Sequence, residues 1–149
     1  MSDEHDAASR RAFLAAAALA ATASGCSLFV KTRTPDATAR VEGGAFRLAL
    51  ADHPALGRAG GTCVVALEGG PVEKVILFRR LGGDVAALDI ECTHQGCDVD
   101  YAGDRDRVVC PCHGSEYDPW GRNLKGPAKE PLARYAVSEA DGAILVTVE

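Results

Sequence analysis

The chain has 149 residues, of which 47% are hydrophobic and 25% are charged, and its formal net charge is −5. This length allows one modest globular domain together with a terminal segment. Lysine and arginine residues are scattered along an acidic chain and form no basic stripe, which argues against nucleic acid as a partner.

The first thirty residues are expected to be a targeting segment that precedes the domain. Arg10 and Arg11 come directly before an alanine-rich apolar run, and no charged residue occurs from 12 to 30. A charged start followed by an apolar run is the layout of an export signal. The stretch SRRAFL (9–14) resembles a twin-arginine signal. The alternative, a buried alanine-rich helix of the domain, is disfavoured by the arginine pair at the start of the run.

The end of this segment suggests how the domain is held at a membrane. The stretch ASGC (23–26) resembles a lipoprotein processing site, at which Cys26 would become the lipidated terminus. The uncharged run is also close to the ~20 residues that span a bilayer, so an uncleaved anchor is the other possibility. Both predict a domain tethered on the outer, periplasmic side of the cytoplasmic membrane. Residues 31–44 are polar, with Pro35 and a glycine pair, and predict a linker.

The remainder, 45–149, is predicted to be an all-β domain, an antiparallel sandwich or barrel. Apolar or alternating runs are separated by turn signals, of which Asp141-Gly142 is a strong hairpin signal. No window beyond the first thirty residues has helical periodicity over three turns. The predicted strands are 45–50, 62–67, 74–80, 84–90, 107–110, 134–139 and 143–149.

Two short segments concentrate the sulfur and imidazole groups of this domain. They read CTHQGC (92–97) and CPCHGSEY (110–117), and they hold four of the six cysteines and two of the four histidines. Such clustering indicates metal or redox chemistry rather than a dispersed disulfide framework. If all four cysteines bound metal, both histidines would be spare. If one cysteine and one histidine of each segment bound it, a cysteine pair would be left over, and a disulfide between those two would join the segments.

The ligands of the second arrangement would be Cys92, His94, Cys110 and His113, and its spare pair would be Cys97 and Cys112. A structural zinc site is an alternative of another class, because cysteine and histidine also suit Zn²⁺.

The pattern C-T-H-x-G-C followed by C-P-C-H-G-S resembles the Rieske iron–sulfur family, in the disulfide-containing type found in cytochrome bc complexes. The resemblance covers roughly 45–149 and implies a [2Fe–2S] cluster in a subdomain at about 91–132. It implies that Cys92 and Cys110 hold one iron, that His94 and His113 hold the other, and that a disulfide pairs the two remaining cysteines, Cys97 and Cys112.

The resemblance also implies residues that tune and shield the cluster. Ser115 and Tyr117 stand where high-potential members donate hydrogen bonds to a bridging sulfide and to the Cys92 sulfur, which raises the reduction potential. The stretch GPAKEPL (126–132) is similar to the family's cluster-covering loop, whose shape Gly126 and Pro127 are expected to fix.

The function implied is one-electron transfer in the iron–sulfur subunit of a membrane quinol–cytochrome c oxidoreductase, with quinol and cytochromes of the b and c types as partners. On this interpretation the chain relays electrons and is not a catalyst by itself. An exported location agrees with a disulfide, which needs an oxidising compartment. Gln95 stands where quinol-oxidising members usually have leucine. A stand-alone periplasmic electron carrier, or the small subunit of a molybdenum oxidase of the arsenite type, therefore remains an alternative.

Overall fold

The computed structural model describes residues 32–149, so the targeting segment at 1–30 and Cys26 lie outside the described residues. Among residues 32–149, no helix is both long enough and apolar enough to cross a membrane. The only helical element in this part of the chain is a short 3-10 turn, η1 (Pro54–Gly57). All other regular structure is β, which confirms the predicted fold class.

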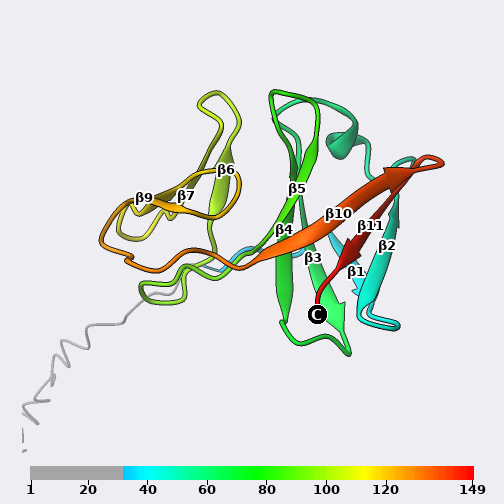
Figure 1. The fold of residues 1–149 in the computed structure, drawn as a ribbon, viewed down its shortest axis with the longest axis horizontal. Helices are drawn as coiled ribbons and strands as arrows, with labels where there is room; N and C mark the ends of the chain where they lie inside the picture. Colours follow the sequence, from blue (N-terminus) through cyan, green and yellow to red (C-terminus); the bar gives the residue numbers. More distant parts are fainter. Residues whose placement is uncertain (1–31) are drawn as a thin grey trace, which may run out of the picture.

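The strands form two sheets (Figure 1). The larger sheet has the order β1-β3-β4-β5-β10-β11-β2, and its end strands β1 and β2 lie beside each other, so that it is nearly closed into a barrel. Its members are β1 (Ala37–Arg40), β2 (Ala45–Ala49), β3 (Thr62–Glu68), β4 (Lys74–Arg79), β5 (Val85–Asp89), β10 (Arg134–Ala140) and β11 (Ala143–Thr147). The smaller sheet has the order β6-β7-β8-β9, with β6 (Asp100–Ala102), β7 (Arg107–Val109), β8 (Glu116–Tyr117) and β9 (Asn123–Lys125).

The central strands of the large sheet are buried on both faces. In β4, Val75 and Leu77 face the core inside the barrel, whereas Ile76 and Phe78 face a second core beneath the small sheet. All four side chains are fully buried. A strand covered on both sides reads as a continuous apolar run rather than as an alternating one, which is why the stretch VILF carries no polar residue.

All seven predicted strands are present, with ends within two residues of those expected. Strand β1 differs from expectation because it lies inside the stretch expected to be a linker. It pairs in parallel with β3, from Ala37 opposite Val65 to Arg40 opposite Glu68. Its side chains are small or polar and none is fully buried, so the sequence carries no apolar signal for it. The backbone ladder with β3 holds it in the sheet, and its two alanines pack partly buried against the barrel core.

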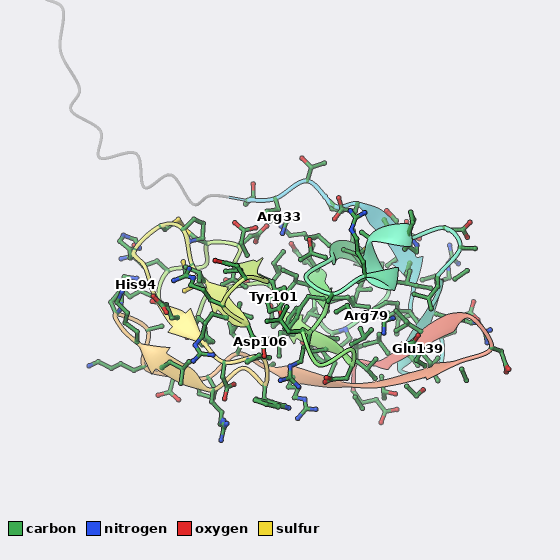
Figure 2. The ribbon with its side chains drawn as sticks, turned by 90° about the horizontal axis from the view of Figure 1, so that it is seen from above. Arg33, Arg79, His94, Tyr101, Asp106 and Glu139 are labelled. Atoms are coloured by element: carbon green, nitrogen blue, oxygen red, sulfur yellow. A yellow bond between two sulfur atoms is a disulfide. The ribbon has the colours of Figure 1, made fainter. Side chains whose placement is uncertain are left out.

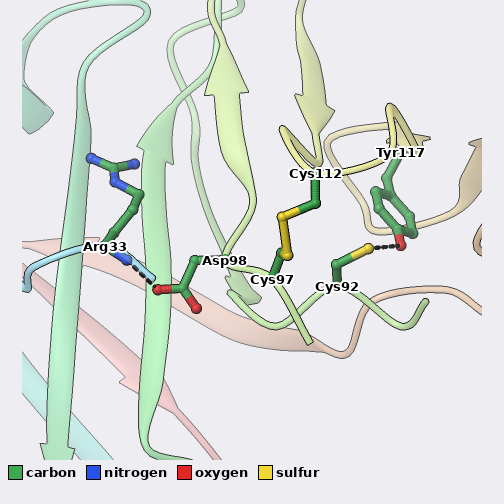
Figure 3. The surroundings of a disulfide bond; sticks show 6 residues. All are labelled: Arg33, Cys92, Cys97, Asp98, Cys112 and Tyr117. Carbon is green, nitrogen blue, oxygen red and sulfur yellow. Dashed lines mark hydrogen bonds between the residues drawn. A yellow bond between two sulfur atoms is a disulfide. The ribbon is translucent and has the colours of Figure 1, made fainter. Parts of the chain in front are cut away.

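The chain enters the domain beside the first cysteine segment. The backbone N–H of Arg33 donates to Asp98 Oδ2 at 2.6 Å, and the Arg33 guanidinium pairs with Asp100 Oδ1 at 2.8 Å. Asp98 is only 3% exposed, and Lys74 neutralises it from the other side. Figure 3 shows Arg33 bonded to Asp98, one residue after Cys97. The N-terminal end of the described chain is therefore fastened at the base of this segment.

Side chains of the two sheets meet in a joint that fixes the small sheet on the large one. The ring of Phe78 in β4 stacks on Tyr101 in β6, with ring centroids 4.1 Å apart. The Tyr101 hydroxyl donates to Asp106 Oδ1 at 2.5 Å, and Arg80 donates to Asp106 Oδ2 at 3.1 Å. Figure 2 shows Tyr101 and Asp106 in the middle of the molecule, between its two ends.

Candidate metal centre

Two loops with the same backbone hydrogen bonds form one end of the molecule. The first follows β5, and the second connects β7 to β8. In each loop the amide of the first cysteine donates to the carbonyl five residues on, and the amide four residues on donates back to that cysteine's carbonyl. These bonds, 2.8–3.0 Å long, are Cys92 N to Cys97 O, Gly96 N to Cys92 O, Cys110 N to Ser115 O and Gly114 N to Cys110 O.

A glycine at the same position of each loop makes this conformation possible. Gly96 has φ of 76° and Gly114 has φ of 75°. This left-handed region is open to glycine but costs other residues conformational energy. The equivalent spacing from the first cysteine to the glycine therefore gives two equivalent turns, each presenting a cysteine and a histidine.

A disulfide joins Cys97 of the first loop to Cys112 of the second, as predicted (Figure 3). Their Cα atoms are 6.5 Å apart, and 15 residues separate them along the chain. The sulfurs of Cys97, Cys112 and Cys110 lie within 4.8 Å of one another. Because a disulfide sulfur is not a thiolate, only Cys110 of these three offers a strong metal ligand.

Cys92 and Cys110 are the two free thiols of the loops, and they are 2% and 1% exposed. Burial acts to raise the pKa of Cys92, but hydrogen bonds from the Tyr117 hydroxyl and the His94 amide outweigh it, and the pKa is lowered. Burial raises the pKa of Cys110, and its interaction with Cys92 raises it further. The pair thus favours a thiolate at Cys92, and the thiolate is the form that binds metal.

The two histidines lie together at the end of the molecule. Their ring centroids are 4.7 Å apart and their planes meet at 86°. His113 is exposed and His94 is half-buried, at the end opposite Glu139 in Figure 2. The Nδ1 atom of His94 is buried and has no hydrogen-bond partner within residues 32–149. A buried polar atom without a partner is unfavourable, and coordination of a metal ion would satisfy it. The donor set therefore fits a metal centre.

The segment expected to cover the cluster, which we call the cover loop (126–132), packs against the two loops through Ala128 and Leu132. Gly126 and Pro127 are exposed. Ala128 and Leu132 are each 3% exposed and belong to the same core as the cluster-loop cysteines. The Ala128 amide donates to the Ser115 hydroxyl oxygen at 3.0 Å, and Ser115 is fully buried. Ser115 therefore joins the second loop to the cover loop.

Tyr117 is fully buried, and its hydroxyl lies 3.3 Å from Cys92 Sγ (Figure 3). Burial, together with the contact to Cys92, raises the pKa of Tyr117 to about 12. The hydroxyl thus keeps its proton at neutral pH and can donate it. It also lies 3.1 Å from Thr93 Oγ1, and Thr93 donates to the carbonyl of Glu130 in the cover loop at 2.8 Å. The sequence interpretation missed Thr93, although a hydroxyl directly after a candidate ligand was a usable signal.

Comparison with known proteins agrees with this geometry. The family model of the Rieske [2Fe-2S] domain matches residues 56–136. The chain is 40% identical over 76 residues to the cytochrome b6-f complex iron-sulfur subunit of Chlorobaculum tepidum, covering 51% of this chain and 41% of that protein. It is 37% identical over 98 residues to the corresponding subunit of Synechococcus elongatus, covering 66% and 52%. The chain thus spans about half the length of these curated relatives.

One solved structure is matched over nearly its whole length. The cyanobacterial plasma membrane Rieske protein PetC3 from Synechocystis PCC 6803 superimposes with a TM-score of 0.54 at 33% sequence identity. The match covers 66% of this chain and 94% of that one. The residues that the family model matches, 56–136, include both loops, the disulfide and the joint between the sheets. From its sequence, its fold and its paired loops, this chain belongs to the Rieske [2Fe-2S] domain family.

Proposed function

We propose that this chain relays single electrons through a [2Fe–2S] cluster, as the iron–sulfur subunit of a membrane quinol–cytochrome c oxidoreductase of the bc type. Cys92 and Cys110 would hold one iron, and His94 and His113 the other. The observation that carries this proposal is the pair of equivalent loops, which bring two buried thiols and two adjacent imidazoles to one end of the domain.

The charge of this donor set favours a high potential. When bound, the cluster supplies a one-electron acceptor, in the range of about −150 to +300 mV for sites with two histidines. Two thiolates and two neutral imidazoles leave the oxidised centre without net charge, whereas four thiolates would leave it a dianion. Ser115 and Tyr117 lie buried beside Cys92, where donated hydrogen bonds withdraw electron density from sulfur and raise the potential further.

The exposure of the histidines suits contact with a redox partner. His113 is exposed, so one of its ring nitrogens can accept or donate a hydrogen bond to a docked molecule. The names of the curated relatives, iron-sulfur subunits of cytochrome b6-f complexes, support cytochrome partners. Quinol as the electron source is what the resemblance to the family implies. The similarity to a plasma membrane Rieske protein supports a place at the cytoplasmic membrane, and the twin-arginine-like start supports the periplasmic side.

Metal analysis of the matured protein tests the ligand set. We expect two irons and two acid-labile sulfides per chain, together with an EPR signal on reduction. A zinc site would instead be colourless and EPR-silent. Cys92→Ser and Cys110→Ser should each abolish the signal. Cys63→Ser is the matched control, because Cys63 is also a buried free cysteine but lies in the barrel core. A colourless, zinc-loaded wild-type protein would contradict the proposal.

A second candidate function is that of a stand-alone periplasmic carrier or of the small subunit of a molybdenum oxidase. Gln95 favours it, because this exposed polar side chain stands beside His94 at the tip where a partner would dock. Purification from membranes separates the possibilities. Co-purification with a cytochrome b would support the bc-type complex, and a molybdenum-containing partner or no partner would support the second candidate.

A further inference from the structure

A chain of hydrogen-bonding groups leads from the candidate ligand Cys92 to the cover loop. The Tyr117 hydroxyl lies 3.3 Å from Cys92 Sγ and 3.1 Å from Thr93 Oγ1. The Thr93 hydroxyl in turn donates to the carbonyl oxygen of Glu130 at 2.8 Å. Tyr117 is fully buried, so its hydroxyl meets these groups and not solvent, whereas Thr93 is exposed.

The protons of this chain can be counted. A carbonyl oxygen only accepts, so the bond to Glu130 uses the single hydroxyl proton of Thr93. Thr93 Oγ1 can then meet Tyr117 only as an acceptor. The one hydroxyl proton of Tyr117 therefore faces two acceptors, the Cys92 sulfur and the Thr93 oxygen.

The hydroxyl of Ser115, the other expected donor to the cluster, makes a different contact with the cover loop. Its oxygen accepts the Ala128 amide at 3.0 Å, which leaves the serine's own proton free to be donated to sulfur. The cover loop thus presents an amide donor to Ser115 and a carbonyl acceptor to Thr93. Among the described residues, the Tyr117 hydroxyl thus has a second acceptor, the Thr93 oxygen, beside the Cys92 sulfur.

We propose that Thr93 is a positioning residue that draws part of the Tyr117 hydrogen bond away from Cys92 and so holds the midpoint potential below the value that Tyr117 alone would set. This inference rests on the proposed function, because it requires a bound cluster. A weaker hydrogen bond to the ligand sulfur leaves more electron density on it, which disfavours reduction. The cover loop controls this lowering of the potential, because the Glu130 carbonyl accepts the hydrogen bond of the Thr93 hydroxyl. The threonine oxygen can then meet Tyr117 only as an acceptor.

Voltammetry of the matured, cluster-loaded protein tests the proposal, after iron and sulfide analysis of the wild type has tested the cluster itself. Thr93→Val removes the hydroxyl and keeps the shape, and we expect an upward shift of the midpoint potential. Thr93→Ser keeps the hydroxyl and should keep the wild-type value. In a Tyr117→Phe background, Thr93→Val should cause no further shift, because the residue acts through Tyr117.

A second readout reports the hydrogen bond directly. The shift of the iron–cysteine stretching band on transfer to heavy water, measured by resonance Raman spectroscopy, should grow in Thr93→Val. An unchanged or lowered potential in Thr93→Val would overturn the proposal, as would a shift that persists in the Tyr117→Phe background. Thr93→Ala supplies the same comparison if Thr93→Val does not retain iron. Loss of iron from both variants would show that Thr93 serves retention rather than tuning, and would overturn it too.

Discussion

The guanidinium of Arg80 lies over the indole ring of Trp120, with its central carbon 4.2 Å from the ring centroid. Arg80 follows β4 of the large sheet, and Trp120 lies between β8 and β9 of the small one. The same guanidinium pairs with Asp106 at 3.1 Å. One arginine therefore holds two points of the small sheet, and through it the loops that carry the candidate ligands.

Arg80→Ala should loosen the small sheet. We expect the free energy of unfolding to fall by about 1–3 kcal/mol, because the variant loses both the contact with the Trp120 ring and the largely buried ion pair with Asp106. Arg40→Ala is the matched control, since Arg40 is 73% exposed and meets Glu68 only at 3.6 Å. Urea unfolding measures both variants. Equal stability of the two would contradict the role given to Arg80.

Ser115→Ala and Tyr117→Phe should each lower the midpoint potential. If each hydrogen bond favours the reduced state by about 1–2 kcal/mol, the shift is on the order of 50–100 mV for one electron. Voltammetry at fixed pH gives the value. Iron content must stay at the wild-type level for the comparison to hold. The tuning role would be lost if both loaded variants kept the wild-type potential.

Replacing both Cys97 and Cys112 by serine should destabilise the domain and release the two loops from each other. Closing a loop of about 15 residues contributes about 3 kcal/mol in the chain-entropy model. We expect a lower denaturation midpoint and a lower iron-to-protein ratio. Wild-type protein treated with a reductant should move toward the double variant, whereas Cys63→Ser should keep the wild-type iron-to-protein ratio. A double variant as stable as wild type would argue against the clamp.

The joint between the sheets predicts a pH dependence of stability. Burial acts to raise the pKa of Asp106, but hydrogen bonds from Tyr101 and Arg80 outweigh it and lower the pKa below its ordinary value of 3.8. Because the folded-state pKa lies below the unfolded one, this stabilisation is complete above about pH 4 and is lost as pH falls through the folded value.

Asp106→Asn should therefore reduce the free energy of unfolding by a constant amount at neutral pH. The difference from wild type should shrink as the pH falls below about 4. Asn also tolerates the positive φ of 49° at this position, so backbone strain does not confuse the comparison. Asp104→Asn is the control, since the Asp104 side chain is 79% exposed. A difference independent of pH down to the acid transition would contradict the assignment.

The two loop glycines form a matched pair for a last test. A Cβ at Gly114 would meet nothing within 4 Å, so Gly114→Ala measures only the strain of positive φ, about 1–2 kcal/mol. At Gly96 the same strain of positive φ is combined with a close contact, because a Cβ there would lie 2.9 Å from Glu91 Oε1. Gly96→Ala should therefore cost at least as much stability and displace the Glu91 side chain, which a crystal structure of the variant would reveal. A neutral Gly114→Ala would refute the requirement for glycine.

The sequence predicted those parts of the fold that side-chain burial specifies. The run from Val75 to Phe78 is predictable as a strand because its side chains pack alternately into two cores. The hairpin at Asp141-Gly142 is predictable because both residues readily adopt the positive φ that its turn requires. Strand β1 could not be foreseen, since its place depends on backbone pairing with β3 and not on its own side chains. In the small sheet β7 was predicted, whereas β6, β8 and β9, which have only two or three residues each, were missed.

Those features of the site that depend on residues close together in the sequence were predictable. Cysteine and histidine spacing identified the candidate ligands, and the resemblance to a known family supplied the disulfide that the structure contains. The position of Thr93 directly after Cys92 was a usable signal, but its contact with Glu130, 37 residues away, could not be read from spacing. Likewise, the path of the cover loop, which buries its Ala128 and Leu132 and leaves its Gly126 and Pro127 exposed, could not be read from spacing.

The fastening of Arg33 has a mechanical consequence. Tension applied to the chain at Thr32 reaches Asp98 and Asp100 before it loads the ladder between β1 and β3. Since Asp98 directly follows Cys97, that force acts at the cysteine-bearing end of the domain and not at its far hairpins. A hinge between this domain and the preceding part of the chain would therefore lie beside the first cysteine segment and not at the far end of the barrel.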